Sequence, residues 1–343
     1  MKTLAIPAVL CVLLLLVLCF VVPDGQILWE AADALYTGDA LSAFSWSAFP
    51  YGIGLAASAL VAFLFSFLLA RRRVSLHRAL AWFACALALG IVFSRLLYCV
   101  VETAYYNPKW LSSLAGLRLW DGGMAMTGAI AGILLAGKLI PDGRSLIPVA
   151  APVFIAGARL SELFIQLGYG PSVDFEGILT QQVGYATRLN VSLLEAAMAL
   201  VILICILLLL RWASHRQMTL GNKHPICAFL ILYGISQLLM ESLRKDRHMI
   251  WGFTKAQQIF AILLVLGALL YLASGKKEKG RVWLASLCCV VPLIGLEFAL
   301  DRVDVPILIL YGAYLLILAA YLWASYRIFQ HSLKSIPGTS TPH

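Results

Sequence analysis

Residues 191–211 read VSLLEAAMALVILICILLLLR, an almost unbroken run of apolar side chains with one acidic residue, Glu195, near its start. A helix needs about 20 such residues to cross the hydrocarbon core of a bilayer. This stretch therefore predicts a membrane-spanning helix. Nine further segments have the same character: residues 4–22, 49–70, 79–101, 122–140, 146–167, 226–243, 256–273, 283–298 and 305–326. The pattern predicts an all-α fold, a polytopic membrane bundle of about ten transmembrane helices.

The composition of the chain excludes several classes of protein. Of 343 residues, 62% are hydrophobic and 13% are charged, whereas soluble domains average roughly 45–50% and about 25%. The mean hydropathy of +0.89 agrees. A soluble globular protein, a disordered chain and a disulfide-stapled secreted module are excluded. The eight cysteines lie in or beside apolar runs, without a CxxC or a Cys/His cluster, so we predict no metal site, no disulfide framework and no cofactor.

The distribution of Lys and Arg predicts the orientation of the helices. With the N-terminus inside, the basic clusters at 71–78, 138–144, 211–223, 276–281 and 327–334 all fall in cytoplasmic segments. The first outer loop, 23–48, carries four acids and no base. Both termini are then cytoplasmic, and the net charge of +9 reflects membrane orientation rather than a nucleic-acid partner. The lack of an A-x-A-like site after residue 22 favours an uncleaved anchor over a signal peptide.

One outer segment departs from this rule. Residues 244–255 carry four basic side chains against the single acid Asp246. Such a cluster could hold an anionic lipid head group. Alternatively, the short loop is forced outward by the topology of its neighbours, and the sequence leaves both interpretations open.

Charged side chains inside spanning segments indicate a functional site by default. Two groups have spacings that place their members on one helix face: Arg159, Glu162 and Gln166, and Gln237, Glu241 and Arg244. Together with Arg95 they map to the outer half of the membrane under this orientation. We predict a shared polar cavity that binds an anionic ligand. The alternative is a set of structural ion pairs that holds the helices together.

The fourth apolar segment begins with the stretch WDGGMAMTGAIAG, residues 120–132. Gly128 and Gly132 form a GxxxG motif, which allows two helices to approach closely. Gly122 and Gly123 leave the start of this helix open, so that its backbone N–H groups are available to an anion.

Several stretches share their order and spacing with the motifs of a bacterial family. They are Tyr51-Gly52, Ser94–Tyr98, Trp120–Met124, Ala158–Leu163, Ser192–Glu195, Tyr233–Arg244 and Gln257. On these motifs the chain resembles the prolipoprotein diacylglyceryl transferases. The resemblance covers about residues 49–273 and implies a seven-helix core. Residues 1–48 would then add an anchor helix with an acidic outer loop, and residues 274–343 two further transmembrane helices and a short tail.

Three positions differ from the family pattern. Thr127 stands where the family has a histidine, Gln237 replaces an arginine, and Glu162 replaces an asparagine. These differences keep two alternatives to family chemistry open. One is a catalytically inactive relative that binds anionic lipid or a membrane partner, and the other is a transporter of an anionic amphiphile.

The resemblance implies a reaction and a set of residues for it. The family moves the diacylglyceryl group of phosphatidylglycerol to the lipobox cysteine thiol of a prolipoprotein signal peptide, in the bacterial cytoplasmic membrane. Arg159 would hold the phosphate, because its planar fork binds phosphate in a bidentate manner. Glu162 and Glu241 complete the implied catalytic set, with Glu162 as the candidate base. The implied substrate-binding residues are Tyr51, Arg95, Gly122, Gly123, Thr127, Gln237, Arg244 and Gln257.

Overall fold

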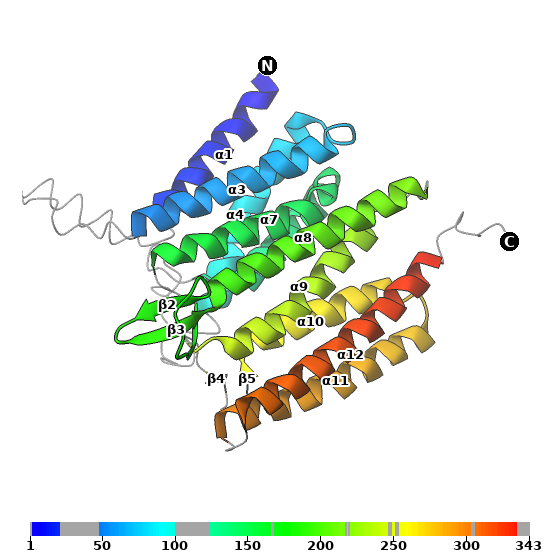
Figure 1. Cartoon of the computed structure of the whole chain (residues 1–343). Helices are drawn as coiled ribbons and strands as arrows, with labels where there is room; N and C mark the ends of the chain where they lie inside the picture. The colour runs from blue at the N-terminus through cyan, green and yellow to red at the C-terminus, as the bar shows by residue number, and fades with distance from the viewer. Residues whose placement is uncertain are drawn as a thin grey trace, which may run out of the picture. The chain divides into compact units, whose positions relative to one another are not determined.

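The computed structural model of the chain confirms the predicted all-α membrane bundle (Figure 1). It describes residues 2–20, 48–99, 124–165, 168–216, 218, 220–245, 249–250, 254–302 and 306–334. The α-helices in these residues are α1 (Lys2–Phe20), α3 (Ala48–Ala70), α4 (Leu76–Tyr98), α6 (Met126–Leu139), α7 (Ile147–Ser161), α8 (Val191–His215), α9 (Lys223–Leu243), α10 (Ala256–Leu272), α11 (Lys276–Arg302) and α12 (Ile307–Lys334).

Every apolar segment predicted from the sequence overlaps one of these helices. Within the described residues, seven are long and apolar enough to cross a membrane, and α1, α6 and α10 are shorter apolar helices. The boundaries differ most at α12, which continues to Lys334 rather than ending at residue 326. Helix α7 ends at Ser161 rather than at residue 167 and continues as the 3-10 helix η6 (Glu162–Phe164). Apolarity places residues in the membrane but does not determine where the backbone leaves the helix.

The chain divides into two compact units, Met1–Leu200 and Val201–His343, with the boundary inside α8. We describe each unit by itself. In the first unit, η5 (Pro141–Ser145) joins α6 to α7. In the second, the short strands β4 (Met249–Ile250) and β5 (Thr254–Lys255) pair between α9 and α10.

Helices α4 and α6 of the first unit pack through the predicted GxxxG motif. A methyl group on Gly128 would lie 2.4 Å from the carbonyl oxygen of Phe93, and one on Gly132 would lie 2.4 Å from that of Leu89. These distances are far below van der Waals contact, so the close approach requires glycine at both positions. The interpretation of this motif as a packing signal is confirmed.

A second close crossing joins α3 to α7. A methyl group on Gly54 would lie 2.3 Å from Ser161 Oγ, and one on Gly157 would lie 2.2 Å from Ser58 Oγ. Each helix therefore presents a glycine to a serine of the other, with three residues between the two small residues of each helix. Small residues at this spacing let membrane helices pack closely. The sequence analysis did not single out this pair of motifs.

We expect Gly128→Ala to destabilise the protein, because the added methyl group has no space against the backbone of α4. Overpacking of this kind costs about 1–3 kcal/mol. The control is Gly267→Ala in α10, where nothing lies within 4 Å of the new methyl group. Unfolding of both variants in the same detergent measures the difference. Equal stability of the two variants would contradict the close approach at Gly128.

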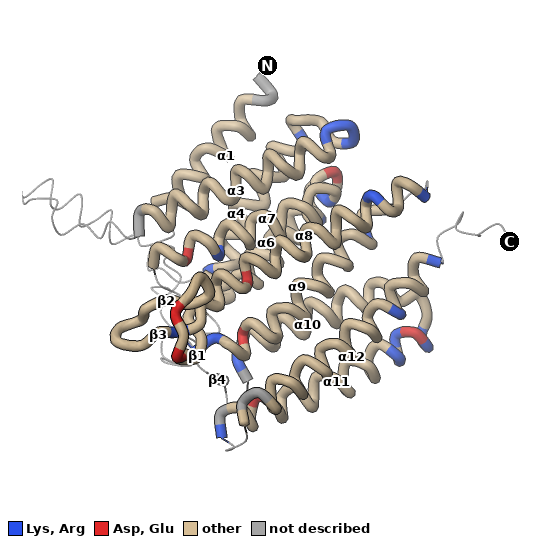
Figure 2. The backbone as a smooth tube through the Cα atoms, in the orientation of Figure 1, with Lys and Arg blue, Asp and Glu red and all other residues tan. Residues whose placement is uncertain are grey.

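The α3–α4 turn and η5 carry charge at one end of the first unit. Arg71, Arg72 and Arg73 are exposed at the turn, and the backbone tube in Figure 2 is coloured blue for basic residues there. Arg78 forms an ion pair of 2.5 Å with Asp142, and both side chains are largely exposed, at 63% and 44%. This end corresponds to the predicted cytoplasmic loops at 71–78 and 138–144.

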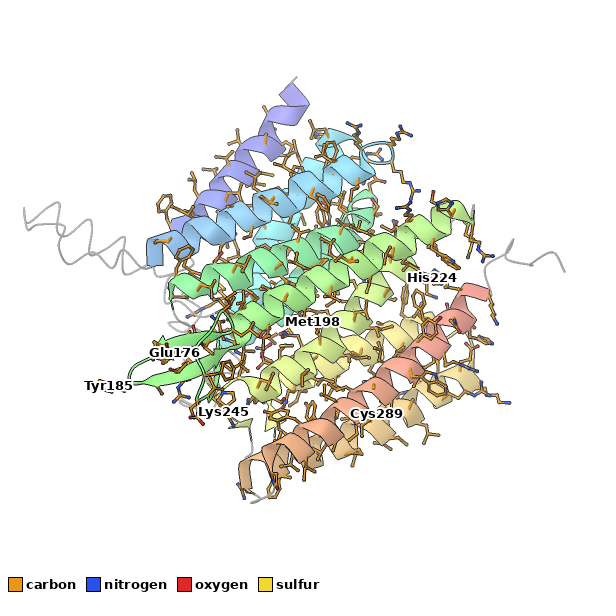
Figure 3. All side chains as sticks on the ribbon, viewed as in Figure 1. Glu176, Tyr185, Met198, His224, Lys245 and Cys289 are labelled. Atoms are coloured by element: carbon orange, nitrogen blue, oxygen red, sulfur yellow. The ribbon has the colours of Figure 1, made fainter. Side chains whose placement is uncertain are left out.

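A small antiparallel sheet links α7 to α8, which the sequence analysis did not predict. Its strands β1 (Tyr169–Ser172), β2 (Thr180–Val183) and β3 (Ala186–Asn190) lie in the order β1-β3-β2. Gly184 has a φ of +62° at the β2–β3 turn, and Tyr185 beside it is fully exposed at the tip of the hairpin (Figure 3). The sheet leads directly into α8, where Asn190 Oδ1 accepts a hydrogen bond of 2.9 Å from the backbone N–H of Leu193.

In the second unit, α12 is bonded to α9 at both ends. The Tyr314 hydroxyl donates to the carbonyl oxygen of Leu238 at 2.9 Å, and the Tyr311 hydroxyl donates to that of Ser242 at 3.2 Å. At the other end, His224 Nε2 and Ser332 Oγ lie 3.2 Å apart. These bonds tie the C-terminal helix to the helix that carries Gln237 and Glu241.

Candidate functional site

The first unit contains a cavity with a volume of about 120 Å³, bounded by α1, α3, α4, α6 and α7. Most of its lining is aliphatic or aromatic. Its hydroxyl-bearing and charged lining residues are Tyr51, Ser94, Arg159 and Glu162. Tyr51 lies in the first turn of α3, whereas Ser94 and Arg159 lie in the last turns of α4 and α7. The polar groups therefore gather at one end of an apolar cavity.

A cluster of one guanidinium and two carboxylates borders this polar end. Arg159 Nη1 pairs with Glu162 Oε1, and Arg159 Nε pairs with Glu195 Oε2. The side chains of Arg159 and Glu195 are 3% and 1% exposed, and that of Glu162 is 11% exposed. Buried charges must be paired to offset their lost hydration. Glu162 is the carboxylate nearer to solvent and, unlike Glu195, it lines the cavity.

The start of α8 supports Glu162 from the other side. Ser192 Oγ donates to Glu162 Oε2 at 2.5 Å. Gly168, with a φ of +72°, accepts hydrogen bonds at its carbonyl oxygen from the N–H groups of Val191 and Ser192. A methyl group on Gly168 would lie 1.9 Å from Ser192 Oγ. A glycine is thus required both for the backbone conformation and for the space that Ser192 occupies.

Two predicted residues of the first unit lie next to this cavity without lining it. Arg95 and Thr127 are buried, and the described lining includes their neighbours Ser94 and Met126 instead. The Arg95 guanidinium lies 5.7 Å from the centre of the Tyr98 ring. The α4 and α6 backbones are joined here, because Ala125 N–H donates to Ser94 O at 3.2 Å and Ser94 Oγ donates to Ala125 O at 2.9 Å.

The remaining predicted residues belong to the second unit or lie outside the described residues. Gln237, Glu241, Arg244 and Gln257 are all buried, at the end of α9 and the start of α10. Arg244 follows the last residue of α9 in an extended conformation, so the predicted helical stripe ends at Glu241. Gly122, Gly123 and Gln166 lie outside the described residues.

Lys255 caps the C-terminal end of α9. Its buried ammonium donates hydrogen bonds to the carbonyl oxygens of Glu241 and Arg244, which are among the carbonyls that a helix end leaves without intrahelical partners. Its backbone N–H donates to Gln258 Oε1 at 3.0 Å. At least one basic residue of the 244–255 segment is therefore a buried hydrogen-bond donor to the backbone, whereas the side chain of Lys245 is exposed.

We expect Lys255→Met to lower the free energy of unfolding by about 1–3 kcal/mol, because two buried carbonyl oxygens lose their charged donor. Lys245→Met is the matched control, since the same change is made on an exposed side chain one residue past Arg244. Denaturation in detergent provides the measurement. A control variant as unstable as Lys255→Met would show that the cap has no special role.

Sequence reasoning missed the partners of Arg159 across the fold. Glu195 was recognised as a charge inside a spanning segment, but nothing in its spacing linked it to Arg159. Ser192 was noted within a motif and not as a partner of Glu162. The intramembrane position of Glu195 was the available signal, because such a charge needs a partner.

Fold and site together define the class of this protein, a polytopic helical membrane protein with a buried guanidinium–carboxylate cluster beside an intramembrane apolar cavity. The family model described as prolipoprotein diacylglyceryl transferase matches residues 40–273, more than half of the chain. The chain belongs to this family, which confirms the resemblance seen in its motifs. Helices α1, α11 and α12 lie outside the matched residues.

Curated relatives agree with the family assignment. The phosphatidylglycerol–prolipoprotein diacylglyceryl transferase of Streptococcus pneumoniae serotype 4 is 27% identical over 223 residues, which cover 61% of this chain and 82% of the relative. The transferase of the same name from Clostridium novyi is 29% identical over 215 residues, covering 57% and 79%. That of Streptococcus agalactiae serotype Ia is 25% identical over 222 residues, covering 61% and 84%.

Proposed function

We propose that this protein transfers the diacylglyceryl group of phosphatidylglycerol to the thiol of a lipobox cysteine in a prolipoprotein. The names of the relatives support the two substrates. The observation that carries the proposal is the position of Arg159 and Glu162 at the polar end of an apolar cavity. A phospholipid has the same division, with an anionic phosphate next to acyl chains.

The proposed reaction is a displacement at a glyceryl carbon. The cysteine sulfur attacks the methylene carbon of the diacylglyceryl group that carries the phosphate ester oxygen. The C–S bond forms as the C–O bond breaks, and glycerol phosphate leaves with the bonding electron pair. The thiol proton passes to a base. The reaction thus needs a cation for the leaving phosphate and a proton acceptor for the thiol.

Arg159 is proposed to bind the phosphate of phosphatidylglycerol. Its guanidinium has five N–H donors in a fixed plane, so it can bind two phosphate oxygens at once. Glu162 would give up its contact with Arg159 to the phosphate, because it lines the cavity and is the more exposed of the two carboxylates. Glu195, almost fully buried, would continue to hold the guanidinium in place.

Glu162 is proposed to accept the thiol proton. Once the phosphate binds the Arg159 guanidinium, the Glu162 carboxylate is released from its ion pair and its oxygen is available to accept the thiol proton. The hydrogen bond from Ser192 would orient the carboxylate. Binding of the lipid would in this way prepare the base for the second substrate.

The other predicted residues have supporting roles in this proposal. Tyr51 lines the cavity together with Arg159 and would donate to a glycerol or ester oxygen. In the second unit, Gln257 is proposed as a further hydrogen-bond donor. Arg95 would brace the phosphate site together with Thr127, Gly122 and Gly123. Glu241, Arg244 and Gln237 would form the polar end of α9. In the proposed orientation, the site in the core at 49–273 would lie in the outer half of the membrane, and both termini would be cytoplasmic.

The test is incubation of the purified protein with phosphatidylglycerol and a synthetic lipobox peptide. We expect release of glycerol phosphate and a peptide mass increased by one diacylglyceryl group. A peptide with serine in place of the lipobox cysteine is the control and should release none. Lipid binding without release, or passage of an anionic amphiphile into liposomes without chemistry, would contradict the proposal.

A further inference from the structure

Three aromatic side chains, Phe63, Trp82 and Phe83, line the part of the cavity that lies farthest along α3 and α4 from Tyr51 and Ser94. All three are buried. The rings of Phe63 and Phe83 stack with their centres 4.5 Å apart and their planes 15° apart. We call these three side chains the aromatic floor. They join α3 to α4 and bound the space between the two helices.

The depth of the cavity is close to the thickness of one lipid leaflet. On α3, twelve residues separate Tyr51 from Phe63, and on α4 twelve residues separate Trp82 from Ser94. At 1.5 Å per residue, both helices place the aromatic floor about 18 Å from the polar end. Half of a bilayer's hydrocarbon core is about 15 Å. A single acyl chain, with its ester group near Arg159, matches this depth.

Small side chains leave room directly above the aromatic floor. Ala59 lies one helical turn from Phe63, and Ala86 lies one turn from Trp82 and Phe83; both line the cavity. A larger side chain at either position would point into the space that a chain end would occupy. Along both α3 and α4, the lining of the cavity therefore changes from alanine to aromatic side chains within about one helical turn.

The aromatic floor is held from below by the backbone. A methyl group on Gly143 of η5 would lie 2.1 Å from the Trp82 ring, so this ring rests against the chain itself. The Trp82 indole N–H has no hydrogen-bond partner among the described residues. A buried donor without a partner is unfavourable, which indicates that the position uses the bulk of the indole rather than its polarity.

We propose that the aromatic floor sets the longest acyl chain that the lipid substrate can carry. The inference rests on the proposed function only for the identity of the lipid head group. A chain that reaches the floor fills the cavity, whereas each further methylene group has to stay outside or force the aromatic rings apart. Phe63, Trp82 and Phe83 are specificity-determining residues in this account and take no part in the displacement.

The experiment compares phosphatidylglycerols with saturated chains of increasing length. Initial rates of glycerol phosphate release are measured for the wild type and for variants of the floor and of the layer above it. For the wild type we expect the rate to fall at least about fivefold once a chain is longer than the optimum, because extra methylene groups have to be inserted into a packed interior. Trp82→Leu should move the optimum to longer chains by about two methylene groups.

Two further variants distinguish a change in chain-length preference from a general loss of folded protein. Ala86→Leu fills the cavity above the floor and should move the optimum to shorter chains, opposite to Trp82→Leu. Phe65→Leu is the matched control, because this phenylalanine lies on the exposed face of α3, and it should leave the profile unchanged. Identical profiles for the wild type, Trp82→Leu and Ala86→Leu would overturn the inference.

A second measurement separates this inference from the proposed reaction. Native mass spectrometry after exposure to an equimolar mixture of chain lengths reports which lipids each variant retains, without any chemistry. A retained distribution that moves in opposite directions for Trp82→Leu and Ala86→Leu supports the aromatic floor even if no variant releases glycerol phosphate. If the variants transfer diacylglyceryl groups to the peptide but retain the same distribution of chain lengths as the wild type, the proposed reaction is supported and the role of the aromatic floor is overturned.

Discussion

Replacing Arg159 with alanine is expected to abolish glycerol phosphate release, with a fall in kcat of at least about 100-fold. The leaving phosphate gains negative charge as the C–O bond breaks, and this side chain is the cation that lines the cavity in the described residues. Preorganised donors of this kind act most strongly where water is excluded. The assay is the rate of glycerol phosphate release at saturating phosphatidylglycerol and lipobox peptide.

Arg159→Lys distinguishes the geometry of the fork from its charge. Lysine keeps the positive charge but cannot bind two phosphate oxygens and the Glu195 carboxylate in one plane. We expect about a tenfold or greater loss of kcat with the fold retained. Arg78→Ala, which removes an arginine from the exposed pair with Asp142, is the control and should retain full activity. An Arg159→Lys variant with wild-type rates would argue against phosphate binding at this position.

Glu195→Ala is expected to destabilise the protein by about 3–5 kcal/mol, because it leaves the buried Arg159 guanidinium without one of its two carboxylates. The cost comes from an uncompensated charge that water cannot reach. Since Glu195 is 1% exposed, solvent cannot replace the lost partner. The measurement is the free energy of unfolding in a fixed detergent, followed by helical circular dichroism.

The matched control for this prediction is the exposed ion pair at the other end of the first unit. Asp142→Ala removes the carboxylate that pairs with Arg78, and both side chains there are accessible to water. Exposed pairs of this type contribute about 0–1 kcal/mol. The two alanine variants should therefore differ by several kcal/mol. Similar small losses in both would mean that Arg159 is hydrated and that the cluster is not a buried site.

The helices were predictable because apolar length is a local property. A run of about 20 apolar residues enters the membrane whatever surrounds it, so each of the ten segments found in the sequence corresponds to a helix. The GxxxG motif at Gly128 was equally readable, since the spacing of small residues on one face is enough to signal close packing. The strands β1 to β3 were missed because each is five residues or shorter, and their pairing depends on contacts between them.

Within the site, spacing predicted only the contact between neighbours. Arg159 and Glu162 are three residues apart, and their ion pair follows from the helical repeat. The pairing of Arg159 with Glu195, and that of Glu162 with Ser192 thirty residues away, required the start of α8 to be placed beside the end of α7. The family motifs gave the set of candidate site residues, but they did not show which of them share one cavity.

The amino-acid sequence alone therefore predicted the membrane bundle, its helices and its family, because hydropathy and motif spacing act along the chain. Tertiary structure alone decided that Arg159 lies between two carboxylates, that the Lys255 side chain is buried, and that Ala59, Ala86 and Trp82 line the same cavity. A cavity is the space between side chains from several helices, so its shape exists only after those helices have packed.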